Sequence, residues 1–227
     1  MRSLAENLAD IRARISAAAE KAGRDPGEIR LMPVTKTHGV ETLQAAYDAG
    51  LRLFGENRVQ EAAEKAEHFA DRADLRWAII GHLQTNKART VAGFASEFHA
   101  LDSLKVARAL AGPLDDLGRT LDVFIQVNSS GEPQKFGLEP SAVAAFADEL
   151  ASFEVLRVRG LMTLAIFSDD EPAVAACFER MRTLRSELDG AVGGELSMGM
   201  SGDFELAIAY GATTVRVGQA LFGSRPA

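Results

Sequence analysis

The 227-residue chain lacks several features that mark other classes of protein. Its single cysteine, Cys177, excludes an internal disulfide and a metal site built from clustered cysteines. No apolar run approaches the ~20 residues that are needed to span a bilayer. The first residues also lack the apolar core of a signal peptide. We therefore expect a soluble, cytoplasmic protein with no membrane partner.

Positive charge is also in deficit, with 25 Lys and Arg against 32 Asp and Glu and a net charge of -7. A nonspecific nucleic-acid binder needs a basic surface to neutralise phosphates, so we expect no nucleic-acid partner. His38, His68 and His99 show no metal-ligand spacing; we expect them on the surface or in loops, and we expect no metal site. No Gly-x-Gly-x-x-Gly motif follows the first predicted strand, which argues against a dinucleotide site.

What the chain does have is a regular alternation of short apolar runs with helical patterns. The patterns predict strands at 31–36, 51–55, 77–81, 96–101, 121–128, 155–162, 195–200 and 213–218. They predict helices at 3–22, 40–49, 59–69, 85–91, 103–111, 141–150, 172–188 and 203–210, with a last helix from 219.

Strands that alternate with helices form a parallel sheet. The alternation shows no break in composition, and it predicts one domain over residues 1–227. The fold class is therefore α/β, and the predicted architecture is a single (β/α)₈ TIM barrel, slightly shorter than the typical ~250 residues. A doubly wound open sheet is the alternative.

Lys36 ends the first predicted strand. If that strand extends to Lys36, then Met32, Val34 and Lys36 point to one face. Apolar surroundings would lower the pKa of the ammonium and make the amine a nucleophile for Schiff-base chemistry. The alternative is a lysine at a strand end whose amine reaches water.

In a barrel, chemistry takes place at the C-terminal ends of the strands. We expect the residues there to converge on one mouth, although strand ends are also where polar residues simply begin. These residues are Lys36, Asn57, His82, Asn128, Met162, Ser201 and Gly218. His82 could pack against a ring or be an ordinary strand-end residue, and Met198 could border a ligand or belong to the core.

The last two predicted strands each lead into a helix through a glycine, at Ser201-Gly202 and at Gly218-Gln219. Free backbone N–H groups at such turns bind anions, and this corner of a barrel is a frequent phosphate site. The alternative is that the glycines only form turns.

Arg216 shares a strand face with Thr214 and Gly218, so we expect its side chain inside the barrel near the mouth. A buried arginine stays charged and needs an acceptor, either an interior carboxylate or a ligand atom. A ligand with an aldehyde, a ring acceptor and a phosphate would suit Lys36, Arg216 and the glycine turns. Pyridoxal 5′-phosphate (PLP) has that shape. The alternative is a Schiff-base aldolase acting on a sugar phosphate, which would use the same lysine and the same phosphate site.

The sequence resembles the PLP homeostasis protein family of the YggS/PROSC type, over nearly its whole length. The matching runs are Val34-Thr35-Lys36, Phe54-Gly55-Glu56-Asn57-Arg58-Val59-Gln60-Glu61, Ile80-Gly81-His82-Leu83-Gln84-Thr85-Asn86-Lys87, Gly160-Leu161-Met162-Thr163, Leu196-Ser197-Met198-Gly199-Met200-Ser201-Gly202-Asp203 and Val215-Arg216-Val217-Gly218.

The resemblance implies a barrel like the N-terminal domain of bacterial alanine racemase, the PLP fold type III. It implies that Lys36 holds PLP as a Schiff base, that Arg216 faces the pyridine nitrogen, and that Asn57 lines the pocket near the ring. It also implies that the phosphate cup is Ser201, Gly202, Gly218 and Gln219. The sequence departs from the family at Gln219, where a small hydroxyl residue is common, and at His38, where a second lysine is common.

The family is implicated in holding and supplying PLP and in amino-acid balance, without robust catalysis. We therefore expect a monomer that is not an enzyme, has no catalytic residues and has PLP-dependent apo-enzymes as partners. Alanine racemase uses a second domain for a second acid/base, and we expect none here because the chain ends at Ala227. An arginine at the ring nitrogen also weakens the ring as an electron sink. The alternative is a one-domain racemase with Lys36 as its only base.

Overall fold

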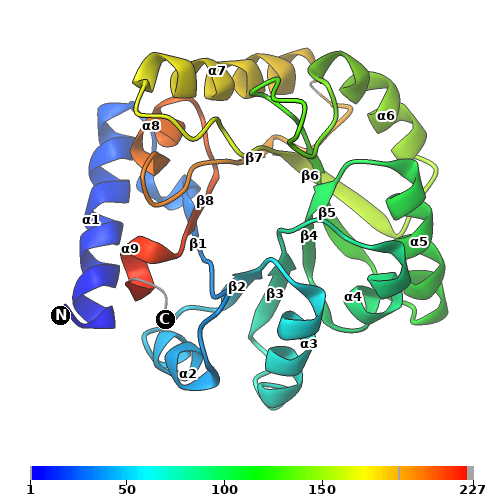
Figure 1. Cartoon of the computed structure of the whole chain (residues 1–227), viewed down its shortest axis with the longest axis horizontal. Helices are drawn as coiled ribbons and strands as arrows, with labels where there is room; N and C mark the ends of the chain where they lie inside the picture. The colour runs from blue at the N-terminus through cyan, green and yellow to red at the C-terminus, as the bar shows by residue number, and fades with distance from the viewer. Residues whose placement is uncertain (1, 189, 224–227) are drawn as a thin grey trace.

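The fold is a barrel of eight parallel strands with helices on its outside (Figure 1). The structure is a computed structural model, and it describes residues 2–188 and 190–223. The strand order is β1-β8-β7-β6-β5-β4-β3-β2, and a bridge between Val34 and Gly55 joins the two end strands. The predicted TIM barrel is confirmed, and the open doubly wound sheet is wrong.

The strands follow the predicted pattern with shifts at their ends. They are β1 (Arg30–Pro33), β2 (Leu53–Glu56), β3 (Arg76–Ile79), β4 (Glu97–Leu101), β5 (Leu121–Gln126), β6 (Leu156–Met162), β7 (Glu195–Ser197) and β8 (Thr214–Val217). The prediction that the first strand extends to Lys36 is wrong. The chain turns there, because the His38 N–H donates to the Thr35 carbonyl and Thr37 has a positive φ of 68°.

Helices connect the strands as predicted. They are α1 (Leu4–Lys21), α2 (Val40–Asp48), α3 (Val59–His68), α4 (Ala88–Phe94), α5 (Leu104–Asp116), α6 (Val143–Leu150), α7 (Glu171–Glu187), α8 (Phe204–Ala209) and α9 (Gln219–Phe222), with short 3₁₀ helices at Pro26–Glu28, Thr85–Lys87 and Pro140–Ala142. Helix α5 continues past its predicted end at residue 111 and through Pro113, because Leu110 and Leu114 extend its buried face. None of the helices in the described residues combines the length and apolarity needed to cross a membrane.

Two cores result from the alternation of side chains along the strands. The larger core lies between the sheet and the helices and includes Phe54, Phe98 and Val215. The second lies inside the barrel and includes Met32 and Ala78. The interior also contains a set of buried polar side chains, which the site below uses.

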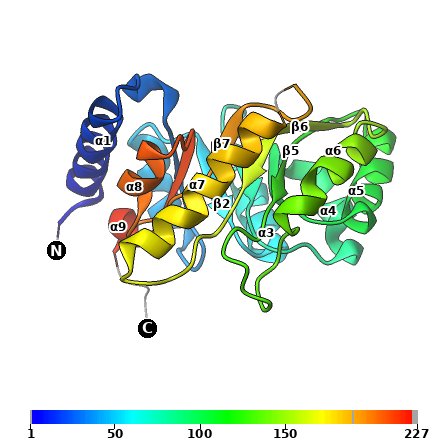
Figure 2. The same cartoon turned by 90° about the horizontal axis from the view of Figure 1, so that it is seen from above.

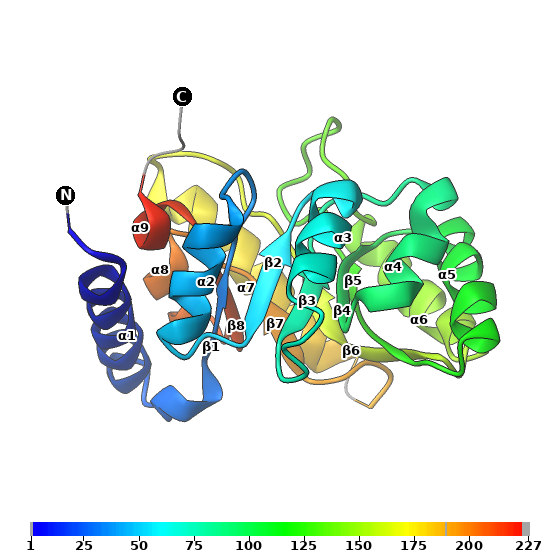
Figure 3. The same ribbon diagram turned by 90° about the horizontal axis from the view of Figure 1, so that it is seen from below.

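The loops that follow the strands lie at one end of the barrel. Figures 2 and 3 show the loops after β1 and β5 and helix α9 at this end. We call this end the mouth. The strand ends approach closely here: a Cβ built on Gly81 would lie 2.2 Å from the Asn57 carbonyl oxygen, and one on Gly218 would lie 3.1 Å from the Val34 carbonyl oxygen. Glycine at 81 is therefore required by backbone contact between the ends of β2 and β3.

Candidate cofactor site

The structure places the predicted strand-end residues around the mouth. Lys36, Asn57 and His82 follow β1, β2 and β3, while Ser201 and Gly218 follow β7 and β8. Backbone hydrogen bonds tie neighbouring ends together, from the Val34 N–H to the Val217 carbonyl and from the Thr35 N–H to the Gly55 carbonyl, each 3.0 Å. The end of β1 is therefore joined to the ends of both β2 and β8, and Lys36 follows β1 between these two strands.

Lys36 lies half-buried in a turn whose backbone is held on both sides. On one side, the Thr35 carbonyl accepts a hydrogen bond of 2.8 Å from Lys65 Nζ, and the Thr35 hydroxyl donates to Glu56 Oε1 at 2.5 Å. On the other side, the Thr37 N–H donates to Glu61 Oε1 at 2.7 Å, and Thr37 has a φ of 68°. The amine of Lys36 is thus presented from a fixed backbone.

The contacts behind Lys36 converge on the buried Lys65 of helix α3. Lys65 Nζ also donates to Glu56 Oε1 and Glu61 Oε1, each at 2.7 Å. Burial raises the pKa of Glu56 even though Lys65 and Thr35 oppose the shift. Burial also acts to raise the pKa of Glu61, but the hydrogen bonds from Lys65 and the Thr37 N–H outweigh it and lower the pKa. Sequence analysis missed this network, although the Glu61–Lys65 spacing of four residues on a helix was a visible signal.

Arg216 is buried inside the barrel near the mouth. Its Nη1 donates to the Ser197 carbonyl and hydroxyl oxygens at 2.7 and 2.8 Å, and its Nη2 donates to the Thr163 carbonyl at 2.6 Å. No carboxylate of the described residues forms an ion pair with it, so of the two alternatives an interior carboxylate is not its acceptor in the described part of the chain. Burial lowers the pKa of Arg216 to about 10, with Asp203 acting against the shift. The guanidinium therefore stays charged at neutral pH.

The predicted phosphate residues lie in two neighbouring turns. The Ala220 N–H at the start of α9 donates to the Ser201 hydroxyl at 3.3 Å, which links the turn after β8 to the turn after β7. A Cβ built on Gly202 would meet nothing within 4 Å, so the backbone there is open to a ligand. Gly199 has a φ of 93°, and a Cβ on it would lie 2.7 Å from the Ala207 Cβ, so this bend requires glycine. Asp203 stabilises the loop by accepting from the Met200 N–H at 2.5 Å.

Three other predicted residues have different surroundings. Asn57 is half-buried, and its Oδ1 atom is buried without a hydrogen-bond partner among the described residues. The His82 ring stacks on Phe136 with 4.3 Å between ring centroids, and its side chain is 41% exposed. Met198 is fully buried and belongs to the larger hydrophobic cluster. Contact of these three residues with a cofactor stays a prediction.

Sequence analysis placed His99 on the surface or in a loop, and this was wrong. His99 lies on β4 and is fully buried inside the barrel. Its Nδ1 lies 2.9 Å from the Ser197 hydroxyl of β7, and its Nε2 lies 2.9 Å from Glu97 Oε2. The alternation of Glu97 and His99 on one strand face was the available signal, but nothing in the local sequence reveals partners on distant strands.

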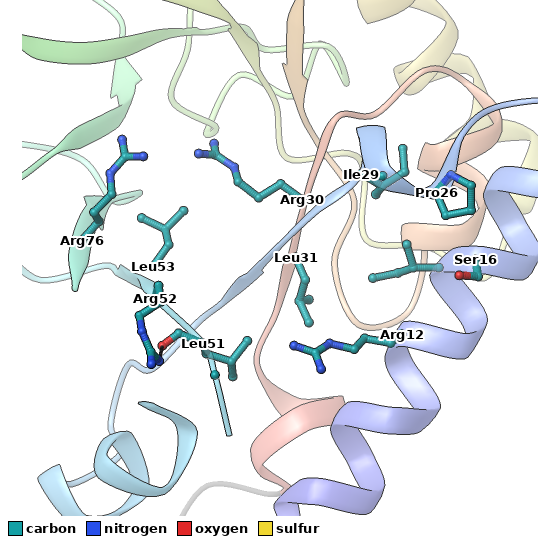
Figure 4. Close-up of a pocket in the computed structure, with 13 residues that line it drawn as sticks. Arg12, Ser16, Pro26, Ile29, Arg30, Leu31, Leu51, Arg52, Leu53 and Arg76 are labelled. Carbon is teal, nitrogen blue, oxygen red and sulfur yellow. Dashed lines mark hydrogen bonds between the residues drawn. The ribbon is translucent and has the colours of Figure 1, made fainter. Parts of the chain in front are cut away.

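A cavity of about 590 Å³ lies at the opposite end of the barrel from the mouth (Figure 4). Arginines from several elements line the cavity, and most of them already form ion pairs with carboxylate side chains of the protein. Arg30 and Arg76 contact Glu97 at 2.7 and 3.1 Å. Arg52 contacts Asp74 at 2.6 Å. The cavity contains none of the predicted site residues, and we do not assign it to the cofactor.

The groups at the mouth fit PLP. A guanidinium has five N–H donors, and the bonds of Arg216 to Ser197 and Thr163 leave donors for a ligand acceptor. Asn57 Oδ1 lacks a partner among the described residues, and the open backbone at Gly202 beside the Ser201 hydroxyl suits a phosphate. No group of three or more potential metal ligands occurs in the described part of the chain.

Comparisons with known proteins agree with this geometry. The family model of the alanine racemase N-terminal domain matches residues 7–226. The fold and the matched model define the chain as a barrel protein of the alanine racemase N-terminal type. Alanine racemase of Clostridium difficile has the same barrel, with a TM-score of 0.73 at 18% identity over 99% of this chain and 57% of that chain.

Relatives with higher identity narrow the assignment. A PLP homeostasis protein of Pseudomonas aeruginosa is 43% identical over 99% of this chain and 97% of its own. PipY of Synechococcus elongatus, whose structure has been solved with PLP bound, is 36% identical with a TM-score of 0.86 over 97% of this chain and 100% of that chain. The chain belongs to the PLP homeostasis protein family.

Proposed function

We propose that this protein binds PLP at the mouth of its barrel and acts in cofactor storage and delivery and in amino-acid balance, without robust catalysis. The observation that supports this most is Arg216. Its guanidinium is buried and charged, and it is fixed by three hydrogen bonds with no carboxylate partner among the described residues. Such a group has donors available for a ligand acceptor inside the barrel.

Each residue of the mouth has a role in this proposal. Lys36 would hold PLP, because its amine would condense with the aldehyde that the cofactor supplies, with release of one water. The Lys65 network holds the turn around Lys36 in place. Arg216 would donate a hydrogen bond to the ring nitrogen. Asn57 lines the pocket near the ring. The phosphate binds at Ser201, Gly202, Gly218 and Gln219.

The position of Arg216 explains why binding without turnover is expected. A guanidinium remains protonated at neutral pH, so it donates to the ring nitrogen and does not transfer a proton to it. An unprotonated ring nitrogen makes the ring a weak acceptor of electrons from a bound amino acid. Storage requires only that the cofactor is held, and Arg216 can do this without assisting proton abstraction.

The setting of this function is part of the proposal. The single PLP-binding domain would act as a monomer in the cytoplasm. Its partners would be PLP-dependent apo-enzymes that receive the cofactor. Transfer would require release from Lys36, whose half-buried turn opens on the mouth.

The test is a titration of the protein with PLP, monitored by visible absorption, together with a steady-state amino-acid racemisation assay. We expect a saturable visible band in the wild type and in Lys21→Ala, a control at an exposed lysine of α1. Arg216→Ala should bind more weakly. Racemisation well above the rate with free PLP would contradict the storage role and support the racemase. A wild type without any band would contradict PLP binding and favour the aldolase.

A further inference from the structure

A chain of buried hydrogen bonds crosses the barrel interior below the cofactor site. It connects Arg216 Nη1 to the Ser197 hydroxyl at 2.8 Å, the hydroxyl to His99 Nδ1 at 2.9 Å, and His99 Nε2 to Glu97 Oε2 at 2.9 Å. All of these side chains are at most 3% exposed. Strands β4 and β7 are not neighbours in the sheet, so the bond between His99 and Ser197 spans the interior.

Only one assignment of protons gives every hydrogen bond of this series one donor and one acceptor. Arg216 has no acceptor atom, so it must donate to Ser197. Glu97 is ionised, since it accepts hydrogen bonds from Arg30 and Arg76 and its pKa is lowered to about 2. An ionised carboxylate only accepts, so His99 Nε2 carries the proton. In the neutral ring Nδ1 is then an acceptor, and the Ser197 hydroxyl donates to it.

The neutral ring is also what its surroundings favour. Burial, opposed by Glu97, lowers the pKa of His99 to about 4, and the charges of Arg216 and Arg30 act in the same direction as burial. The ring is stacked on Phe124 with 3.9 Å between centroids and 25° between planes. It therefore has a fixed orientation as well as a fixed tautomer.

We propose that His99 is a positioning residue for the cofactor site, which acts through Ser197 to fix the guanidinium of Arg216. Because the hydroxyl proton of Ser197 points to His99, the lone pairs of its oxygen are directed to Arg216 Nη1. The guanidinium plane is then set by three acceptors, and its remaining donors face the ligand. This role rests on the proposed PLP function.

Glu97, at the end of this hydrogen-bond chain that is farthest from Arg216, is held by two arginines at the end of the barrel opposite the mouth. Arg30 donates to both oxygens of Glu97, at 2.7 and 2.9 Å, and Arg76 donates to Glu97 Oε1 at 3.1 Å. Figure 4 shows these two arginines at the cavity. They keep Glu97 ionised and in place, which fixes the tautomer of His99. These hydrogen bonds therefore connect the end of the barrel opposite the mouth to Arg216 near the mouth.

The test compares the full-length wild type with His99→Leu and Ser197→Ala. The control is Phe98→Leu, a fully buried residue of the same strand in the larger core. We measure the PLP dissociation constant, the position of the visible band and the thermal midpoint of each. We expect about tenfold weaker binding and a shifted band in His99→Leu and Ser197→Ala, which is the effect of one buried hydrogen bond. Phe98→Leu should lose stability but keep the band position and the dissociation constant.

A second measurement needs no cofactor. Nitrogen NMR of the histidine-labelled protein at neutral pH should show His99 with a protonated Nε2 and an unprotonated Nδ1. A protonated Nδ1 would overturn the proton assignment. If the wild type binds PLP and His99→Leu matches Phe98→Leu in band position and affinity, the positioning role is wrong. A wild type that shows no band would instead mean that the proposed PLP function has failed.

Discussion

The stability of the protein should fall in mild acid because of His99. The pKa of this histidine is lowered from 6.5 to about 4, mainly by burial. Between these two values the unfolded chain binds a proton at this position and the folded chain does not. The unfolded state is therefore favoured progressively as the pH falls from about 6.5 toward about 4.

The size of the effect follows from the same pKa. At about 1.36 kcal/mol for each pH unit, the fall from 6.5 to about 4 amounts to about 3 kcal/mol of unfolding free energy. The His99 side chain is fully buried, so solvent does not screen this interaction. Glu97, with a pKa lowered to about 2, adds its own loss only below its ordinary value of 4.5. The two contributions occur in different pH ranges.

The assay is urea unfolding of the wild type and of His99→Leu from about pH 7 to about pH 4.5. The histidine at position 38 has a pKa that is also lowered by burial and contributes in the same direction, but it is present in both proteins. The difference between the two curves therefore reports His99 together with its hydrogen-bonded partner Glu97. We expect the wild type to lose about 2 to 3 kcal/mol more than the variant over this range. Parallel curves would show that His99 titrates alike in the folded and unfolded states, and they would refute the neutral, buried assignment.

Three further predictions concern the mouth. Lys65→Met should lower the unfolding free energy measured in urea by about 3–5 kcal/mol, because it leaves Glu56 and Glu61 without their buried partner. The control Glu64→Gln, at an exposed position of the same helix, should have little effect. Equal stabilities of the two variants would contradict the role of this network. Gly81→Ala should lower the unfolding free energy by about 1–3 kcal/mol, because the added Cβ would contact the Asn57 carbonyl. The control Gly93→Ala on α4 adds a Cβ that meets nothing within 4 Å, so it should leave the unfolding free energy unchanged or raise it. Gly202→Ala should change the thermal stability little and weaken PLP binding, since its Cβ has space in the protein but would occupy the proposed phosphate position; unchanged affinity would exclude close backbone approach there.

The sequence pattern predicted the barrel because eight short apolar runs alternate with helical segments, and this periodicity reflects burial directly. The inward position of Arg216 followed from the same alternation, since Val215 and Val217 mark the opposite face. The end of β1 could not be predicted, because it depends on a turn in which Thr37 has a positive φ, a conformation that threonine rarely adopts.

His99 was misplaced for a related reason. A histidine between apolar neighbours on a short strand resembles a surface residue when only its local sequence is considered. Its burial is stabilised by Glu97 on one side and by Ser197, almost a hundred positions away, on the other. The Lys65 network has the same character, because its local pair with Glu61 is visible in the sequence but its bonds to Glu56 and the Thr35 carbonyl need the fold.

The measurement that decides the assignment of Lys36 is borohydride reduction of the PLP-treated protein, followed by mass mapping of the modified peptide. We predict that the label is fixed on Lys36 in the wild type. Lys36→Ala, shown by its thermal midpoint to be folded, should take up no label under the same conditions. A label on another lysine, or equal labelling of Lys36→Ala, would contradict the cofactor site described for the mouth of this barrel.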